Sequence, residues 1–335
     1  MQITSSNILF FSIIAAIVPA FGYSLVIYWF DHYEKEPIWL LTATFFWGAV
    51  PSVILALIAS LAFSAPLALI GGPSATNTIM AVFIAPPVEE TVKAFALVAI
   101  FLMRREEIDS LLDGIIYGAM VGMGFAMVEN IFYFVTVFQE QGVGAWGTTV
   151  FIRAVVFGLN HALFTSTTGL GLAVSRFSRA RLLRIVTPIA GWSGAVMLHA
   201  IHNLAASNGG LLCLVLPFTD WGGVALILLI ILWALLQERR WIRKYLKEEI
   251  GLGTLTARQY EVACSLRGRL ADRLQALFNN GPSAYLAVTR FYRLCSELAY
   301  KKHHYLILHE APSEHLTVQL RKELSDLSGH TTLNL

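Results

Sequence analysis

Charged residues are scarce in this sequence. Asp, Glu, Lys and Arg make up 14% of its 335 residues and hydrophobic residues make up 56%. A soluble protein has about 25% charged residues. Many of the few charges lie after residue 237. This composition excludes an ordinary soluble protein, and it predicts a transmembrane domain over residues 1–237 followed by a cytoplasmic tail over 238–335.

Cysteine is nearly absent as well. The three cysteines, Cys213, Cys264 and Cys295, are too few and too widely spaced for a disulfide framework or a CxxC metal site. The net charge of +2 gives no indication of a nucleic-acid partner, and we expect none. The N-terminus lacks the basic start of a signal peptide, and its apolar run is long enough to be kept as a first membrane span.

Long hydrophobic runs are what the sequence does contain. A helix needs roughly 20 residues to cross the hydrocarbon core of a bilayer. About seven runs reach that length, so we predict an all-α, polytopic membrane helix bundle with a small helical tail. The predicted spans are 7–30, 39–63, 78–103, 114–138, 150–175, 187–206 and 211–237.

The loops between these runs indicate an orientation. Lys and Arg occur in loops 31–38, 104–113 and 176–186 and directly after residue 237, whereas the alternate loops contain neither. Positive residues collect on the cytoplasmic side of a membrane. We therefore predict seven spans in the lipid bilayer, with the N-terminus outside and the tail in the cytoplasm.

Ionisable side chains lie at similar depths in four of the predicted spans. At 1.5 Å per helical residue, Glu89 and Glu90 lie roughly 17 Å below the outer end of their span. By the same rise Glu129 lies roughly 14 Å, His161 roughly 17 Å and His199 roughly 10 Å below theirs. Because a charge inside a bilayer is costly, a shared layer of such residues predicts a functional site in the outer half of the membrane.

The spacing along each helix agrees with one site. Lys93 is three residues after Glu90 and four after Glu89, so it can pair with either carboxylate. His199 and Asn203 are four residues apart and share a helix face.

Structural interpretations compete with the functional one. The Glu–Lys pair could be a buried ion pair, and a lone His161 is more often an interhelical hydrogen bond than a ligand. His202 more often lines a helix face near the outer surface. Asn130 and Asn160 are more often contacts between packed helices than chemistry. Each of these interpretations accounts for a single residue, but none explains why several polar residues lie at a similar depth.

Two kinds of chemistry fit the combination of Glu and neutral His. It suits a divalent metal such as zinc, and it also suits a metal-free mechanism with a carboxylate base and histidines that polarise a carbonyl. A proton- or ion-coupled transporter is the alternative, although the hydropathy shows no inverted repeat. A scaffold whose membrane part only anchors the tail is a third interpretation.

The same residues resemble the motifs of the PrsW family of intramembrane proteases, which is related to the CAAX prenyl endopeptidases. The resemblance covers roughly residues 20 to 206 and includes the segment FDHYEKEP after the first span. The motif EExxK matches Glu89, Glu90 and Lys93, and the motif FxxxE matches Phe125 and Glu129. A single histidine of the family matches His161. The motif HxxxB, whose last residue B is polar, matches His199 and Asn203.

The resemblance implies hydrolysis of a peptide bond in a membrane-anchored protein, such as an anti-sigma factor, in a bacterial plasma membrane. In the mechanism we expect, Glu89 or Glu90 takes a proton from water and Lys93 tunes that carboxylate. Zinc held by His161, His199 and Glu129, or those residues alone, would orient the water. Asn203 and His202 would donate to the developing oxyanion. The depth of the layer predicts cleavage near the outer leaflet.

The tail alternates charged and apolar positions at helical spacing, as in TARQYEVACSLRGRLADRLQALF. The segment 279–285 predicts a helix break, with Pro282 in the first turn of the next helix. We expect a small helical domain that docks on the membrane part or binds a partner. His303, His304 and His309 are expected at the surface rather than in a metal site.

Overall fold

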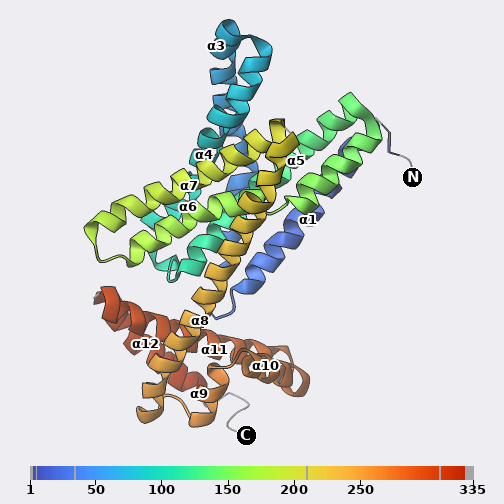
Figure 1. Ribbon diagram of the computed structural model, residues 1–335. Helices are drawn as coiled ribbons and strands as arrows, with labels where there is room; N and C mark the ends of the chain where they lie inside the picture. The colour runs from blue at the N-terminus through green and yellow to red at the C-terminus, as the bar shows by residue number, and fades with distance from the viewer. Residues whose placement is uncertain (1–2, 5, 34, 209, 309–310, 329–335) are drawn as a thin grey trace. The chain divides into compact units, whose positions relative to one another are not determined.

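The computed structural model describes residues 3–4, 6–33, 35–208, 210–308 and 311–328, and these residues form helices and no strand (Figure 1). The all-α prediction is therefore confirmed for the described part of the chain. The α-helices are α1 (Ile8–Phe30), α2 (Ile38–Trp47), α3 (Val53–Ile79), α4 (Ala85–Met103), α5 (Leu111–Val150), α6 (Asn160–Phe177), α7 (Arg181–Asn208), α8 (Gly222–Gly251), α9 (Ala257–Ala263), α10 (Leu266–Asn280), α11 (Pro282–Leu308) and α12 (Ala311–Ser328).

Short irregular helices join several of these. The π-helical segments are η1 (Gly48–Ser52), η2 (Met80–Ile84), η4 (Phe151–Val156) and η6 (Pro217–Trp221), and the 3₁₀ segments are η3 (Arg105–Glu107) and η5 (Gly210–Val215). π-Helical turns often occur at functional sites. Three of the four, η2, η4 and η6, supply residues to the site described below.

Five described stretches are long and apolar enough to cross a membrane: Ile8–Phe30, Ile38–Leu69, Leu111–Phe177, Arg181–Asn208 and Gly210–Gly251. The third is 67 residues long and contains both α5 and α6. Helix α4 is not among the five, because it carries two glutamates and a lysine. These stretches identify an integral membrane protein, and the count of seven spans stays a prediction.

The chain divides into two compact units. Unit 1 comprises Met1–Phe30 and Glu36–Ile231, and unit 2 comprises Asp31–Lys35 and Leu232–Leu335. The predicted boundary between residues 237 and 238 falls inside α8, whose residues belong to both units.

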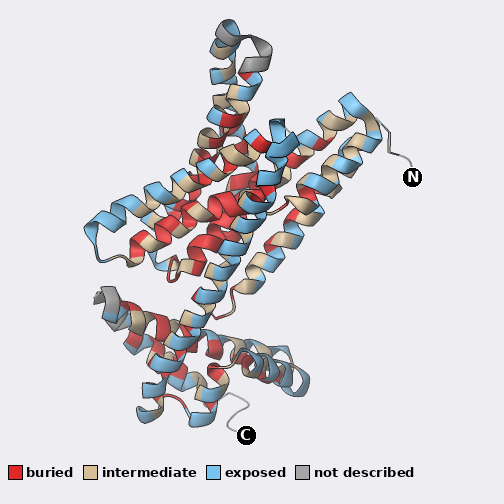
Figure 2. Ribbon diagram, in the orientation of Figure 1, coloured by how far each residue is buried: buried red, intermediate tan, exposed pale blue. Residues whose placement is uncertain are grey.

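Helices α5 and α6 form the centre of unit 1. The most apolar window of Leu111–Phe177 is 83% buried, whereas those of the other four stretches are 11–22% buried. Figure 2 shows the buried residues gathered along these two helices. The surrounding helices turn many large apolar side chains outward, as a bundle in lipid does.

Close packing of α5 on α6 depends on glycine. A Cβ atom at Gly118 would lie 2.6 Å from the Thr165 carbonyl oxygen, and one at Gly122 would lie 2.1 Å from the His161 carbonyl oxygen. Small residues let membrane helices approach this closely. The glycine spacing on α5 therefore determines where α6 places His161.

We predict that Gly122→Ala reduces both stability and activity. The new methyl group has no space unless the His161 backbone moves, and overpacking typically costs about 1–3 kcal/mol. The measurement is thermal unfolding in detergent together with peptide cleavage. Gly144→Ala is the matched control, because no atom lies within 4 Å of its Cβ position. Equal melting temperatures for the two variants would contradict the prediction.

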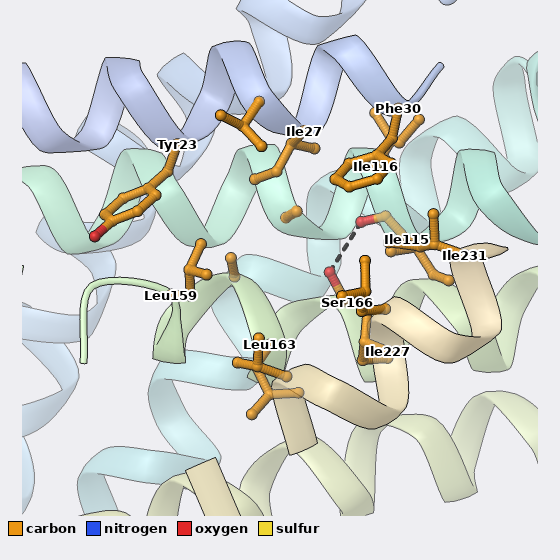
Figure 3. A pocket seen from close by; sticks show the side chains of 15 residues that line it. Tyr23, Ile27, Phe30, Ile115, Ile116, Leu159, Leu163, Ser166, Ile227 and Ile231 are labelled. Atoms are coloured by element: carbon orange, nitrogen blue, oxygen red, sulfur yellow. Dashed lines mark hydrogen bonds between the residues drawn. The ribbon is translucent and has the colours of Figure 1, made fainter. Parts of the chain in front are cut away.

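An apolar cavity of about 230 Å³ lies among α1, α5, α6 and α8 (Figure 3). Two hydroxyl groups belong to residues that line this cavity, and both donate hydrogen bonds to backbone carbonyls. Ser166 Oγ donates to Ile115 O at 2.9 Å, and Tyr23 OH donates to Val155 O at 3.3 Å. The lining of this cavity is therefore better suited to apolar contacts than to polar chemistry.

Unit 2 is built from the end of α8 and from α9 to α12. The run from Thr256 to Phe278, which has helical spacing in the sequence, forms two helices, α9 and α10. The Ser265 side chain caps α10 by accepting from the Gly268 N–H. The predicted break at 279–285 is present: Gly281 has φ +85° and α11 begins at Pro282.

The surface prediction for the tail histidines is wrong for one of them. His304 is 1% exposed. His303 stacks on Trp241 with ring centroids 3.9 Å apart, and burial lowers its pKa to about 4, so it is neutral at pH 7. His309 lies outside the described residues. Both described histidines pack against aromatic rings of the tail, and the His304 ring centroid lies 6.4 Å from that of Tyr300.

Candidate active site

The carboxylate of Glu90 forms the centre of a buried network in unit 1. Lys93 Nζ donates to Glu90 Oε1 at 2.7 Å, and Thr165 Oγ1 donates to Glu90 Oε2 at 3.1 Å. The side chains of Glu90 and Lys93 are fully buried. Because both oxygens of Glu90 have partners, this carboxylate holds its neighbours in place, and it is poorly suited to take a proton from water.

His199 of α7 is fixed by the same carboxylate. Its Nδ1 lies 3.0 Å from Glu90 Oε1, and its ring stacks on Phe164 with centroids 4.9 Å apart. Nε2 therefore remains available, and it lies 3.8 Å from Oε2 of Glu89. Glu89 Oε2 is a buried atom without a hydrogen-bond partner among the described residues.

His161 of α6 connects the network to Glu129 of α5. Lys93 Nζ lies 3.1 Å from His161 Nδ1. An ammonium group only donates, so Nδ1 accepts and Nε2 carries the proton. Nε2 in turn lies 2.9 Å from Glu129 Oε2. The structure thus brings together every residue of the predicted site layer from α4, α5, α6 and α7.

Arg153, which was not among the residues predicted from the sequence, holds Glu129. Arg153 Nη2 donates to Glu129 Oε2 at 2.7 Å, and its Nε donates to Asn130 Oδ1 at 2.8 Å. The guanidinium also lies 3.8 Å from the centre of the Tyr133 ring. A single arginine inside a predicted span was the available signal, because such a charge needs a partner in the membrane.

A second polar cluster lies beside the first and was also missed. Asp220 Oδ2 lies 2.7 Å from His202 Nδ1 and 3.0 Å from Asn160 Nδ2. Asp220 is 1% exposed. Its signal was a single acidic residue inside the last predicted span. His202 and Asn160, expected as a helix-face residue and a packing contact, are partners of this buried carboxylate.

Asn203 lies next to the break before α4. Its Nδ2 donates to the Ala81 carbonyl at 2.8 Å. Ala81 lies in η2, five residues before Pro86, and a proline supplies no N–H to the turn before it. Asn203 therefore satisfies a carbonyl that this helix break leaves free, and its amide has a second hydrogen for another acceptor.

These residues surround a cavity of about 370 Å³. Its wall includes Glu129 and Arg153, all three histidines of the two clusters, and Asn203, together with apolar residues of η4 and of the segment before α8. The cavity thus combines a carboxylate, imidazoles and an apolar wall, which is the composition of a site for a polar reaction on an apolar chain.

The donors present fit a divalent metal. Glu89, His161 and His199 each offer a ligand atom, and these atoms lie within 4.8 Å of one another. Glu89 Oε2 has no hydrogen-bond partner among the described residues, and His199 presents Nε2 while Nδ1 contacts a carboxylate, as metal-bound histidines usually do. The predicted ligand set named Glu129 in place of Glu89, but in the structure Glu129 is held by Arg153.

The sequence was compared with known proteins. Residues 36–236 match the model of a family described as PrsW family intramembrane metalloprotease. The chain is 28% identical over 245 residues to Protease PrsW of Geobacillus kaustophilus, covering 71% of this chain and 96% of that protein. It is 31% identical over 169 residues to Protease PrsW of Bacillus subtilis, covering 50% and 71% respectively. No solved structure matches the chain.

Proposed function

Because this chain belongs to the PrsW family of intramembrane proteases, we propose that the cluster around Glu89, Glu129 and His199 is its active site and cleaves membrane-anchored proteins. The observation that carries this proposal is the buried Glu89 Oε2, which has no described hydrogen-bond partner and lies beside two histidines. Burying these charged side chains among four helices costs free energy, and the packing of the helices alone does not require it.

In this proposal Glu89, His161 and His199 hold a divalent metal, and His161 offers Nδ1, which Lys93 must release, because its Nε2 donates to Glu129. When bound, a metal there would polarise the scissile carbonyl and make a bound water more acidic. Glu90 orients His199 through Nδ1, and Lys93 balances the charge of the two adjacent glutamates.

Glu129 is the group we assign to accept the proton of the attacking water. It lines the cavity, whereas Glu90 is fully engaged. Arg153 Nη2 holds one oxygen of this carboxylate, Oε2, at 2.7 Å, and the same oxygen lies 2.9 Å from His161 Nε2. Asn203 lines the same cavity, and its second amide hydrogen is free to donate to the developing oxyanion.

The substrate proposed is a membrane-anchored protein whose scissile bond lies near the outer leaflet. The predicted depth of the polar layer supports this position. A membrane-anchored anti-sigma factor is the substrate class that the sequence resemblance implies.

The test is cleavage by purified protein in liposomes that contain a pool of single-span peptides. Wild type is expected to produce fragment pairs cut within or beside the membrane, and His199→Ala none. A pH-sensitive dye inside the same liposomes reports proton flux. Proton flux without any cleavage would support the transporter alternative and contradict the proposal.

Cys213 provides a test of the proposed orientation, in which the segment between α7 and α8 is outside. Cys213 is exposed, whereas Cys264 and Cys295 are buried. A membrane-impermeant maleimide added to intact cells is therefore expected to label wild type and to leave Cys213→Ser unlabelled. Labelling that requires permeabilised cells would place this segment in the cytoplasm and reverse the orientation.

A further inference from the structure

The contact between His202 and Asp220 fixes which nitrogen of His202 carries a proton. A carboxylate oxygen accepts, so at 2.7 Å the Nδ1 of His202 donates to Oδ2 of Asp220. Asn160 Nδ2 donates to the same oxygen at 3.0 Å and holds the carboxylate in place. All three side chains come from different elements, η6, α6 and α7, so the arrangement depends on the folded bundle.

The other nitrogen of His202 has no described partner. Among the described residues, every polar contact of the ring uses Nδ1. Its aromatic neighbours are Phe157, in a T-shaped arrangement at 5.4 Å between ring centroids, and Phe164, tilted at 6.2 Å. His202 is partly exposed and lines the cavity that Glu129 also lines. An oriented imidazole with a free Nε2 at a reaction cavity is the arrangement of a proton-transfer group.

We infer that His202, oriented by Asp220 and Asn160, donates the proton that the leaving amide nitrogen needs when the peptide bond breaks. The inference rests on the proposed function of the neighbouring cluster. Asp220 and Asn160 are positioning residues, because they act on the reaction through the His202 ring that they hold.

The protons balance over the reaction. Water attacks the carbonyl carbon, its oxygen forms the new bond, and one of its protons moves to Glu129. The bond between carbon and nitrogen then breaks, and protonated His202 gives its Nε2 proton to the departing nitrogen. Glu129 afterwards returns its proton to His202 through solvent in the cavity, which restores both groups. The carboxylate of Asp220 holds the ring through Nδ1 during the transfer.

The experiment compares two leaving groups. The probe is a single-span peptide that wild type cleaves, together with the same peptide carrying a thioester at the scissile position. A thiolate leaves without being protonated, whereas an amide nitrogen does not. His202→Gln is therefore expected to lower kcat for the amide by about 10²- to 10⁴-fold, the usual contribution of a general acid, and to lower kcat for the thioester by less than about tenfold.

Two further variants accompany His202→Gln. Asp220→Asn is expected to lower kcat for the amide with KM unchanged, and to abolish the low-field imidazole N–H proton resonance of the wild type. Gly144→Ala, which changes a residue that does not line the cavity, is expected to leave both rates unchanged. If Asp220→Asn fails to fold, His202→Gln carries the test, because its side chain is at the cavity surface.

Two results would overturn the inference while leaving the proposed function standing: equal loss on amide and thioester in His202→Gln, or no loss on either. A wild type that cleaves neither probe from any tested peptide would overturn the proposed function, and the role of His202 with it.

Discussion

Wild type is expected to carry about one divalent metal ion per molecule, and replacing His161 and His199 together by alanine is expected to remove it. Even changes to the outer partners of metal ligands reduce affinity by about 10–100-fold, so losing two ligands should leave almost no bound metal. Glu89→Ala should have a similar effect, because Glu89 Oε2 completes the group of ligand atoms within 4.8 Å. Peptide cleavage should disappear with the metal.

The measurement is metal content per chain by mass spectrometry after purification without chelators. His32→Ala is the matched control, since His32 lies in the loop after α1. Thermal unfolding of each variant shows whether the fold is retained. Active, folded wild type without any metal would contradict the metal site. It would also move Glu89 into the role of a base in a metal-free mechanism.

The site layer was predictable because helical rise and spacing are nearly constant. Glu89, Glu90 and Lys93 are neighbours on one helix by spacing alone, and the structure pairs Lys93 with both glutamates. The depth of Glu129 and His161 followed from counting residues, and their contact at 2.9 Å agrees.

Which carboxylate faces which histidine was beyond the sequence. The depth counted along each helix places Glu129 in the same layer as the histidines. It does not show that Arg153, from η4, donates to Glu129 Oε2 at 2.7 Å. The same limit explains Asp220, which is 60 residues from Asn160 and 18 from His202. Such pairs depend on how different helices pack against one another, and the spacing of residues within one helix does not predict that packing.

The helix ends were less predictable than the helices. The run from 39 to 63 was predicted as one span of 25 residues, whereas α2, η1 and α3 continue to Ile79. Sequence hydropathy drops near 64, but helix formation depends on backbone hydrogen bonds and continues past the apolar run. In the tail, His304 was misplaced because histidine is ambiguous between surface and core.

Glu129→Gln is expected to abolish cleavage while the metal stays bound. The amide keeps the size of the side chain and can still accept from Arg153, but it cannot take a proton from water. Loss of a general base typically lowers the rate by about 10²- to 10⁴-fold. The measurement is kcat for the single-span peptide, with metal content determined on the same sample, and both the amide and the thioester probe should lose activity.

The matched comparison is Arg153→Ala. It removes the guanidinium that holds Glu129 but leaves the carboxylate, so we expect a smaller loss of kcat than in Glu129→Gln and an unchanged metal content. If Glu129→Gln lost the metal and kept the protein folded, Glu129 would be a ligand, as the sequence first indicated, and Glu89 would become the proton acceptor. Metal content and kcat measured together therefore decide between the two carboxylates.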